Sequence, residues 1–118
     1  MKKAIFTLKN ILKLKKNKTM QDITVEELKT RIDNGEKLNL IDVREQWEFD
    51  EYNIGAMLIP LGYLQGKIDD IEDWKNEEVI IHCKSGMRSA AAKSFMLQNG
   101  FTNVKNLIGG VLAYQALG

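Results

Sequence analysis

Apolar residues follow two alternating patterns along residues 21–118, short continuous runs and longer segments in which they are spaced as on a helix face. The short runs, rich in β-branched residues, predict buried strands at 38–43, 56–59, 79–83 and 101–107. The spaced segments predict helices at 24–33, 45–51, 61–74 in pieces, 89–99 and 111–117. Strands separated by helices predict an α/β fold whose sheet is mainly parallel, with helices on both faces.

Several local signals fix the expected helix ends and faces. Thr24 and Glu27 match a capping box, which predicts the start of a helix, and Asn34-Gly35 predicts the end of the same helix. In the short helix at 45–51, we expect Trp47 or Phe49 to turn toward the interior. The acidic cluster within 69–73 is expected to be a solvated face.

The stretch 79–89 carries the candidate chemistry. The run Val79-Ile80-Ile81-His82 stops at Cys83, the single cysteine of the chain, and a short polar loop precedes the next helix. Such a turn directs backbone N–H groups and the positive end of the helix dipole at its mouth. Because this helix N-terminus and the nearby Lys84 and Arg88 stabilise negative charge, we predict that Cys83 ionises readily. Ligands of parallel α/β sheets bind beyond the carboxyl ends of the strands, where Cys83 lies.

The composition fits one globular domain. The chain has 118 residues, of which 44% are hydrophobic and 28% charged, and this length can bury a substantial core. A single cysteine excludes an internal disulfide and leaves no second thiol for a resolving or metal-binding pair. Since the chain also has a single histidine, we predict no metal site and no cofactor.

Residues 1–19 form a basic leader ahead of the domain at 20–118. The first 20 positions hold seven lysines and no acidic residue, which leaves ten basic and 16 acidic residues, a net charge of −6, in the remainder. The leader fits either a basic amphipathic helix on an acidic membrane or partner, or a poorly ordered segment before a second start at Met20. Because Lys9 and Lys13 interrupt the apolar run that a signal peptide needs, and no run could span a membrane, we expect a cytoplasmic location.

Six motifs then follow one another in order along the chain. They are Asp42-Val43-Arg44-Glu45, Trp47-Glu48-Phe49, Leu58-Ile59-Pro60-Leu61-Gly62, His82-Cys83-Lys84-Ser85-Gly86-Met87-Arg88-Ser89, Gly100-Phe101 and Asn106-Leu107-Ile108-Gly109-Gly110. As a set they resemble the single-domain rhodaneses, a family of thiosulfate sulfurtransferases, over residues 21–117. The resemblance implies a small α/β rhodanese-like domain with a five-stranded, mainly parallel sheet. It also implies that Cys83 carries sulfane sulfur as a persulfide.

The expected reaction is sulfur transfer through Cys83. Its thiolate attacks the outer sulfur of an anionic donor such as thiosulfate, sulfite leaves, and an external acceptor, cyanide, a thiol or a protein thiol, takes the sulfur. We expect Lys84 to steer the donor, and Arg88 either to bind it or to fold back onto backbone carbonyls of the loop. We expect the persulfide and donor to be bound by the loop residues Lys84, Ser85, Gly86, Met87 and Arg88.

Neighbouring residues are expected to support the site without reacting. Asp42 and Arg44 are expected to form an ion pair or hydrogen-bond network there, and Ser89 to support the loop at the start of the helix. His82 precedes Cys83, but adjacent strand residues face opposite sides of a sheet. We therefore expect His82 to be a hydrogen-bonded structural residue rather than a base.

The sequence departs from the family at two places. The turn 51–56 lacks the histidine and proline of the usual Gly-His-Ile-Pro-Gly-Ala, so no role of that histidine is carried over, and we expect a looser turn. Tyr114 stands where tryptophan is common, which should change packing rather than chemistry.

Two other functions compete with sulfur transfer by an enzyme. Cysteine-dependent phosphatases, and arsenate reductases of similar chemistry, need a loop wide enough for a tetrahedral oxyanion. The phosphatases have five residues between cysteine and arginine, whereas four separate Cys83 from Arg88, and a shorter ring of N–H groups better suits one sulfur atom. The other alternative is a sulfur-carrier or protein-interaction module without turnover. No nucleic-acid partner is predicted.

Overall fold

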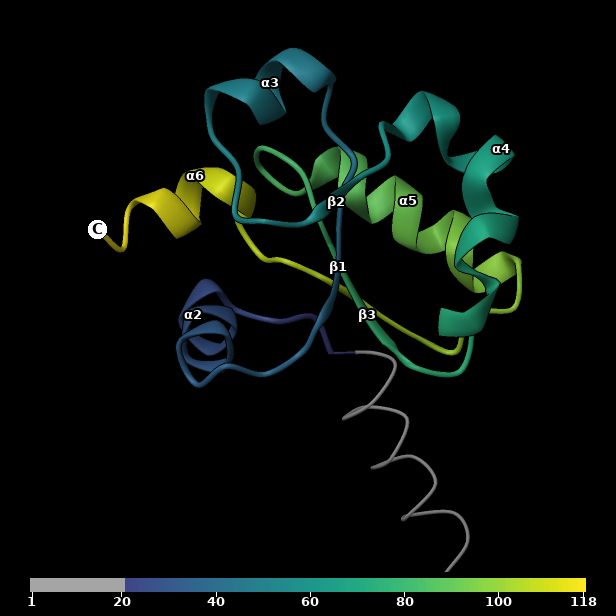
Figure 1. The fold of residues 1–118 in the computed structure, drawn as a ribbon, viewed down its shortest axis with the longest axis horizontal. Coiled ribbons are helices and arrows are strands. Elements are labelled where there is room, and N and C mark those ends of the chain that lie inside the picture. The colour runs from purple at the N-terminus through teal and green to yellow at the C-terminus, as the bar shows by residue number, and fades with distance from the viewer. Residues whose placement is uncertain (1–20) are drawn as a thin grey trace, which may run out of the picture.

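A parallel sheet of four strands lies at the centre of the structure (Figure 1). The computed structural model describes residues 21–118, so the predictions about the leader lie outside the described residues. In spatial order the strands are β2 (Met57–Leu58), β1 (Asn39–Asp42), β3 (Glu78–His82) and β4 (Asn103–Asn106). All three pairings are parallel, which confirms the predicted mainly parallel sheet and places the carboxyl ends of the strands at one edge.

The prediction of five strands is wrong for the described residues, which form four. Ile23 pairs with Leu107 through an isolated parallel bridge instead. The backbone N–H of Ile23 donates to the backbone carbonyl of Asn106 (3.1 Å), and the N–H of Ile108 donates to the carbonyl of Ile23 (2.9 Å). This pairing stops after one residue because Thr24 already caps the first helix.

Helices cover both faces of the sheet. Helices α2 (Val25–Asp33) and α6 (Gly110–Gln115) lie on one face, to the left in Figure 1. The other face carries α5 (Met87–Gln98) and the helical pieces η2 (Leu61–Tyr63), α4 (Leu64–Lys67) and η3 (Ile68–Trp74). The remaining helix, α3 (Gln46–Glu51), lies beyond the end of β1. None of the helices in the described part of the chain is long and apolar enough to cross a bilayer.

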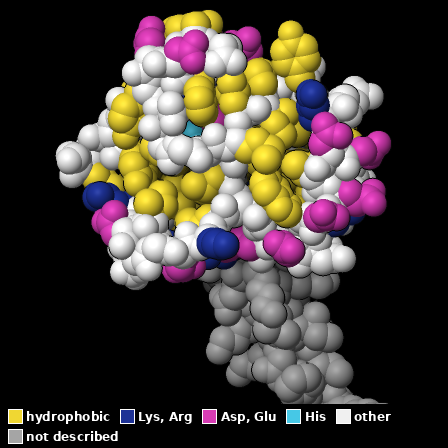
Figure 2. Space-filling view, viewed as in Figure 1, with side chains coloured by type: hydrophobic (Ala, Val, Ile, Leu, Met, Phe, Trp, Pro, Cys, Tyr) yellow, Lys and Arg dark blue, Asp and Glu magenta, His cyan; other side chains and the backbone are white. Residues whose placement is uncertain are grey.

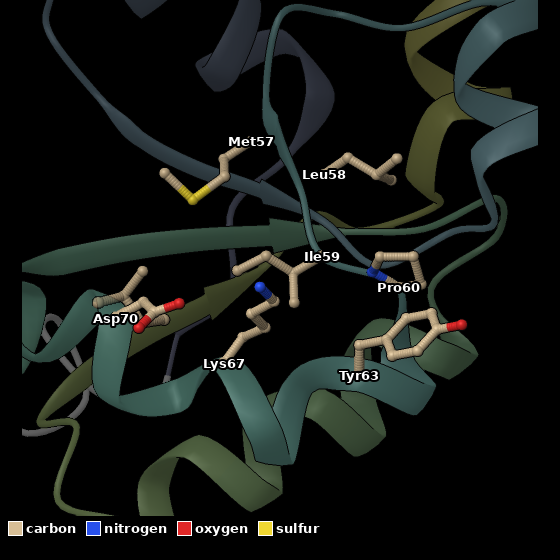
Figure 3. Close-up of a pocket in the computed structure, with 8 residues that line it drawn as sticks. Met57, Leu58, Ile59, Pro60, Tyr63, Lys67 and Asp70 are labelled. Carbon is tan, nitrogen blue, oxygen red and sulfur yellow. The ribbon is translucent and has the colours of Figure 1, made fainter.

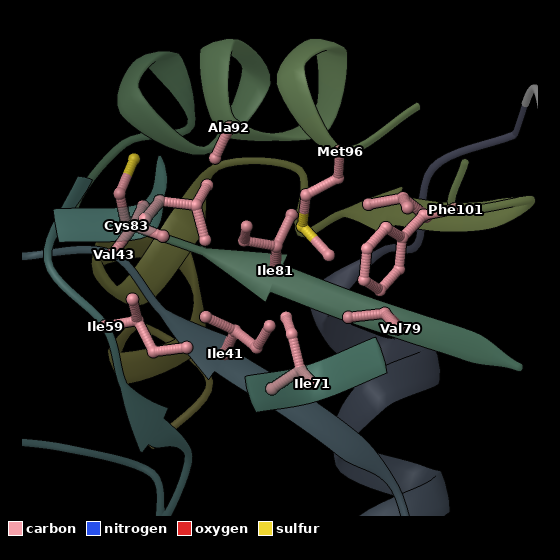
Figure 4. Close-up of a cluster of buried hydrophobic side chains, with 12 residues drawn as sticks. Ile41, Val43, Ile59, Ile71, Val79, Ile81, Cys83, Ala92, Met96 and Phe101 are labelled. Carbon is pink, nitrogen blue, oxygen red and sulfur yellow. The ribbon is translucent and has the colours of Figure 1, made fainter. Parts of the chain in front are cut away.

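The alternation of side chains along β3 divides the core into two clusters. Val79, Ile81 and Cys83 pack toward α5 (Figure 4), whereas Ile80 packs toward α2 and α6. Every residue from Val79 to Cys83 is buried, as expected for the central strand of a sheet covered on both faces. The strand can therefore hold Cys83 rigidly at its end.

Most local predictions are confirmed at the level of single residues. Thr24 and Glu27 form the capping box, with the N–H of Glu27 donating to Thr24 Oγ1 (3.1 Å), and α2 stops before Asn34. The segment 61–74 is helical in three pieces. Helix α5 begins at Met87, two residues earlier than expected. Strand β2 is shorter and less buried than predicted, because it is an edge strand and leaves Met57 46% exposed.

The turn that departs from the family pattern is held by its own asparagine. The side-chain amide of Asn53 donates to the carbonyl of Phe49 (3.1 Å), and its oxygen accepts from the N–H of Gly55 (3.0 Å). These two hydrogen bonds close the turn in the absence of the family's histidine and proline.

Candidate active site

Cys83 lies directly after β3, at the mouth of a loop that leads into α5. Its sulfur accepts from the N–H of Gly86 (3.1 Å), the N–H of Ser89 (3.4 Å) and the Ser89 hydroxyl (3.3 Å). In Figure 4 the sulfur points toward the helix and away from Ile41. Although the side chain is only 1% exposed, its sulfur therefore faces hydrogen-bond donors rather than the apolar core.

The sulfur takes the position of a helix cap. Helix α5 is preceded by Gly86, whose φ of 113° requires a residue without a Cβ and which has no side chain to cap the first turn. Instead, the N–H of Ser89 in that first turn donates to the Cys83 sulfur. A negative charge on Cys83 would thus lie at the positive end of a 12-residue helix.

These donors favour the thiolate. Burial alone would raise the pKa of Cys83, but hydrogen bonds from the Ser89 hydroxyl and from the N–H groups of Ser89, Gly86 and Ser85 outweigh it, so that the pKa of Cys83 falls below its usual value. The predicted direction is confirmed, and the N–H groups at the helix N-terminus are among the expected causes. The donors of the loop and of the first turn of α5 are the main cause, and the charge of Arg88 also interacts with the thiolate.

Helix α6 supports the cysteine loop from outside. The N–H of Val111 donates to the carbonyl of Cys83 (2.9 Å), and that of Leu112 donates to the carbonyl of Lys84 (3.1 Å). This close approach requires glycine at the start of the helix, because a Cβ on Gly110 would lie 2.6 Å from the Cys83 carbonyl oxygen. The Gly109-Gly110 motif therefore fixes the backbone on which the sulfur is mounted.

Asp42 and Arg44 form the expected ion pair at the end of β1. Both are buried, and Arg44 donates from Nη2 and Nε to the Asp42 carboxylate (2.8 and 3.0–3.1 Å). Arg44 also donates to the carbonyls of Tyr52 (2.7 Å) and Glu48 (3.4 Å). The pair thus ties α3 and the residue after it to the end of β1.

Glu48 and Arg88 form a second ion pair, which the sequence did not predict. The guanidinium of Arg88 donates to both carboxylate oxygens of Glu48 (2.7 and 2.9 Å), so α3 is tied to the first turn of α5. Two roles were expected for Arg88, to bind the donor or to fold back onto backbone carbonyls of the loop; its guanidinium bonds the Glu48 carboxylate instead of those carbonyls. One of Trp47 and Phe49 was expected to turn inward. Trp47 is 64% exposed and Phe49 is half-buried, whereas Glu48 is the buried side chain of α3.

The ion pair of Glu48 makes a testable prediction about acid stability. Hydrogen bonds from Arg88 outweigh burial and lower the pKa of Glu48 to about 2. A carboxylate with a depressed pKa stabilises the fold above its unfolded pKa and loses this contribution as the pH falls through the folded value. We expect Glu48→Gln to lower the urea midpoint near neutral pH, and the difference from the parent chain to shrink between about pH 5 and 2.

The matched control is Glu26→Gln, an exposed residue in the first turn of α2. Because the pKa values of Glu27 and Glu78 are also lowered, the parent chain should lose stability in acid in any case, and only the difference between variants isolates Glu48. A Glu48→Gln difference that stayed constant across this pH range would contradict the assignment.

His82 is buried as expected, but the hydrogen bonds expected for it are absent. Neither ring nitrogen has a hydrogen-bond partner within the described residues, and the ring is 0% exposed. Burial therefore lowers the pKa of His82, although the nearby Asp42 carboxylate opposes this. Because Ile81 and Cys83 share one face of β3, His82 occupies the other face and does not approach the sulfur as a base.

The remaining predicted loop residues surround the mouth of the site. Lys84 and Ser85 are exposed, as is Met87, with 82% of its surface accessible. A small hollow of about 140 Å³ beside the loop is bordered by Lys84, Trp47 and Leu112, among others. Lys84 is thus free of the core and available to meet an anion, while Met87 and Trp47 present apolar surface near it.

A separate apolar groove lies along β2. It has a volume of about 370 Å³, and its lining is apolar apart from Tyr63, Lys67 and Asp70 (Figure 3). Hydrophobic side chains also form a band on the face shown in Figure 2, with acidic side chains at its margin. The groove shares no lining residue with the cysteine loop, so we assign it no part in the candidate active site.

Two residues of the site escaped sequence reasoning. Glu48 lies on a short helix whose aromatic residues are stronger local signals, and its partner is 40 positions away. Asn106 ends β4 next to β3, and its oxygen accepts from the Ser89 hydroxyl (2.6 Å). Asn106 could have been found from the sequence, because a polar residue at the carboxyl end of a strand in a parallel sheet is a candidate site residue.

Comparison with known proteins shows the family to which the chain belongs. The family model of the rhodanese-like domain matches residues 24–117. A putative sulfurtransferase of Bacillus subtilis is 35% identical over 97 residues, which cover 81% of this chain and 91% of that protein. A putative sulfur carrier protein of the same organism is 35% identical over 94 residues, 79% of this chain, and the chain spans only 50% of that relative's length.

A solved structure extends the agreement to the fold. The crystal structure of a rhodanese-like domain protein from Staphylococcus aureus superposes with a TM-score of 0.69 at 31% sequence identity, covering 80% of this chain and 90% of that one. The family model spans nearly all of the described residues, including the cysteine loop and both ion pairs. The chain therefore belongs to the rhodanese-like domain family.

Proposed function

We propose that this chain is a sulfurtransferase that carries sulfane sulfur on Cys83. The observation that carries the proposal is the set of three donor groups on the Cys83 sulfur, at 3.1–3.4 Å, at the end of a rigid central strand. Donors fixed in advance stabilise a thiolate and, equally, the terminal anionic sulfur of a persulfide. Relatives named as a sulfurtransferase and a sulfur carrier support the same chemistry.

The proposed first step uses thiosulfate or a persulfide as donor. The Cys83 thiolate attacks the outer sulfur of thiosulfate, a new S–S bond forms at Cys83, and the S–S bond of thiosulfate breaks as sulfite leaves with the electron pair. Lys84, exposed at the loop, supplies the positive charge that attracts the dianion. Arg88 is engaged by Glu48, so its role here is to fix the loop.

The second step returns the cysteine to its starting state. A thiophilic acceptor, cyanide, a thiol or a protein thiol, attacks the outer sulfur, and Cys83 leaves as the thiolate that the donors stabilise. No second thiol exists in the chain to take over the sulfur. The acceptor must therefore be external, and its identity decides whether the domain turns over or acts as a carrier.

The proposal predicts that the protein gains the mass of one sulfur atom when it is treated with thiosulfate. Intact-mass spectrometry measures the gain, and cyanide should reverse it with release of thiocyanate. Peptide mapping should place the sulfur on Cys83. A chain that gains no sulfur from thiosulfate or from a small persulfide donor would contradict the proposal, and a gain of sulfur without catalytic turnover would favour the carrier.

The same preparation tests the phosphatase alternative. The ring of donors closes on a single sulfur atom, with four residues between Cys83 and Arg88. Arg88 is held by Glu48 rather than by the loop, which leaves no guanidinium inside the ring for a phosphoryl group. We therefore expect no hydrolysis of aryl phosphates above that of the Cys83→Ser variant.

A further inference from the structure

Ser89 makes two contacts that a single hydroxyl hydrogen cannot satisfy together. Its oxygen lies 3.3 Å from the sulfur of Cys83 and 2.6 Å from the side-chain oxygen of Asn106. A serine hydroxyl donates one hydrogen, and an amide oxygen can only accept. Since Ser89 is fully buried, no solvent can take the place of either partner.

The orientation of Asn106 is fixed by its surroundings. Its amide nitrogen donates to the carbonyl of Gly86 (3.1 Å), so the oxygen must face Ser89. A flipped amide would set two carbonyl oxygens against each other at Gly86. The backbone N–H of Asn106 donates to Asp22 (2.9 Å), and Asp22 is itself paired with Lys93 (2.6 Å). The acceptor that faces Ser89 is therefore held in place from both sides.

The protonation state of Cys83 decides where the hydrogen can go. With a neutral thiol, Ser89 donates to Asn106 and the S–H group can donate to the free lone pair of Ser89. With a thiolate, the sulfur can only accept, so the Ser89 hydroxyl can bond it only by turning away from the Asn106 oxygen, which then loses its donor. The two states thus compete for one hydrogen.

We propose that Asn106 is a positioning residue that draws the Ser89 hydroxyl hydrogen away from Cys83 and thereby restrains ionisation of the resting thiol. The inference concerns the ionisation of Cys83 and rests on the proposed function in one respect: ionisation matters for activity because the thiolate attacks the sulfur donor in the proposed reaction. Its test measures ionisation without any sulfur donor, so it stands or fails separately from sulfur transfer.

The charged groups around the sulfur stay constant in this test. They are Lys84 in the loop, Arg88 of α5 with its partner Glu48 of α3, and the Asp42–Arg44 pair at the end of β1. Asp22 and Lys93 lie on the far side of Asn106. Replacing Asn106 by leucine, which has nearly the same shape, removes the acceptor without adding or removing a charge.

The experiment is a double-mutant cycle on the full chain, with the ultraviolet absorbance of the thiolate followed against pH and the Cys83→Ser variant as blank. We expect Asn106→Leu to lower the pKa of Cys83 by about half a pH unit to one, the equivalent of one hydrogen bond regained by the thiolate. We expect Ser89→Ala to raise the pKa, and Asn106→Leu to cause no further change in the Ser89→Ala background.

Asn103→Leu supplies the matched control, since it makes the same substitution at the other end of β4. This variant should leave the pKa of Cys83 unchanged. A pKa that stays constant or rises in Asn106→Leu would overturn the inference. So would an equal fall with and without the Ser89 hydroxyl, because Asn106 would then act through its bond to the Gly86 carbonyl instead.

Discussion

Replacing Cys83 by serine is expected to abolish the gain of sulfur and to lower sulfur transfer from thiosulfate to cyanide by more than about a thousand-fold. The serine hydroxyl fits the same ring of donors and accepts the same hydrogen bonds, so the loop should keep its shape. It does not ionise near neutral pH and forms no stable bond to sulfur under these conditions. Steady-state turnover and intact mass, measured on the same sample, check the prediction.

Two controls make the result specific to the sulfur atom. Cys83→Ala should be equally inactive, which excludes a residual role of the hydroxyl. Ser94→Ala, on the exposed side of α5, should keep full activity. If the serine variant folded and still turned over, sulfur would be travelling by another route, and the nucleophile assigned to this loop would be wrong.

The cysteine loop could be predicted because its determinants are local. A β-branched run that ends at Cys83, a glycine at position 86 and a helical segment behind it are enough to direct N–H groups at the sulfur. The capping box at Thr24 was predictable for the same reason, since both of its partners lie within one turn of the chain. Local patterns thus located the cysteine that we propose as the nucleophile and the elements that hold it.

The groups that hold the loop from outside could not be predicted in this way. Arg88 finds its carboxylate on α3, and Ser89 finds its acceptor on β4, so each contact depends on how the sheet brings distant segments together. The hydrophobic pattern of α3 favoured its aromatic residues as the buried ones, but the charge on Arg88 draws Glu48 inward instead. The hydrophobic pattern predicted the four strands that form, whereas the fifth strand implied by the family resemblance is reduced to one bridge at Ile23 in the described residues.

The fold should depend strongly on the ion pair between Asp42 and Arg44. Side chains of this pair are 0% and 5% exposed, and Arg44 satisfies backbone carbonyls at both Glu48 and Tyr52. A buried ion pair adds little compared with a well-packed apolar pair, yet removing one partner leaves the other charge buried and uncompensated. The network therefore behaves as a unit whose members cannot be removed singly.

We accordingly expect Asp42→Ala to lower the free energy of unfolding by about 3–5 kcal/mol, as measured by urea denaturation. The double variant Asp42→Leu/Arg44→Met removes both charges while retaining volume, so it should be more stable than Asp42→Ala despite carrying two substitutions. Lys29→Ala, which removes an exposed ion pair with Asp33, serves as the matched control and should change the free energy by less than about 1 kcal/mol. If Asp42→Ala cost no more than this control, Arg44 would have to reach water when its partner is lost, and α3 would be anchored by the Glu48–Arg88 pair alone.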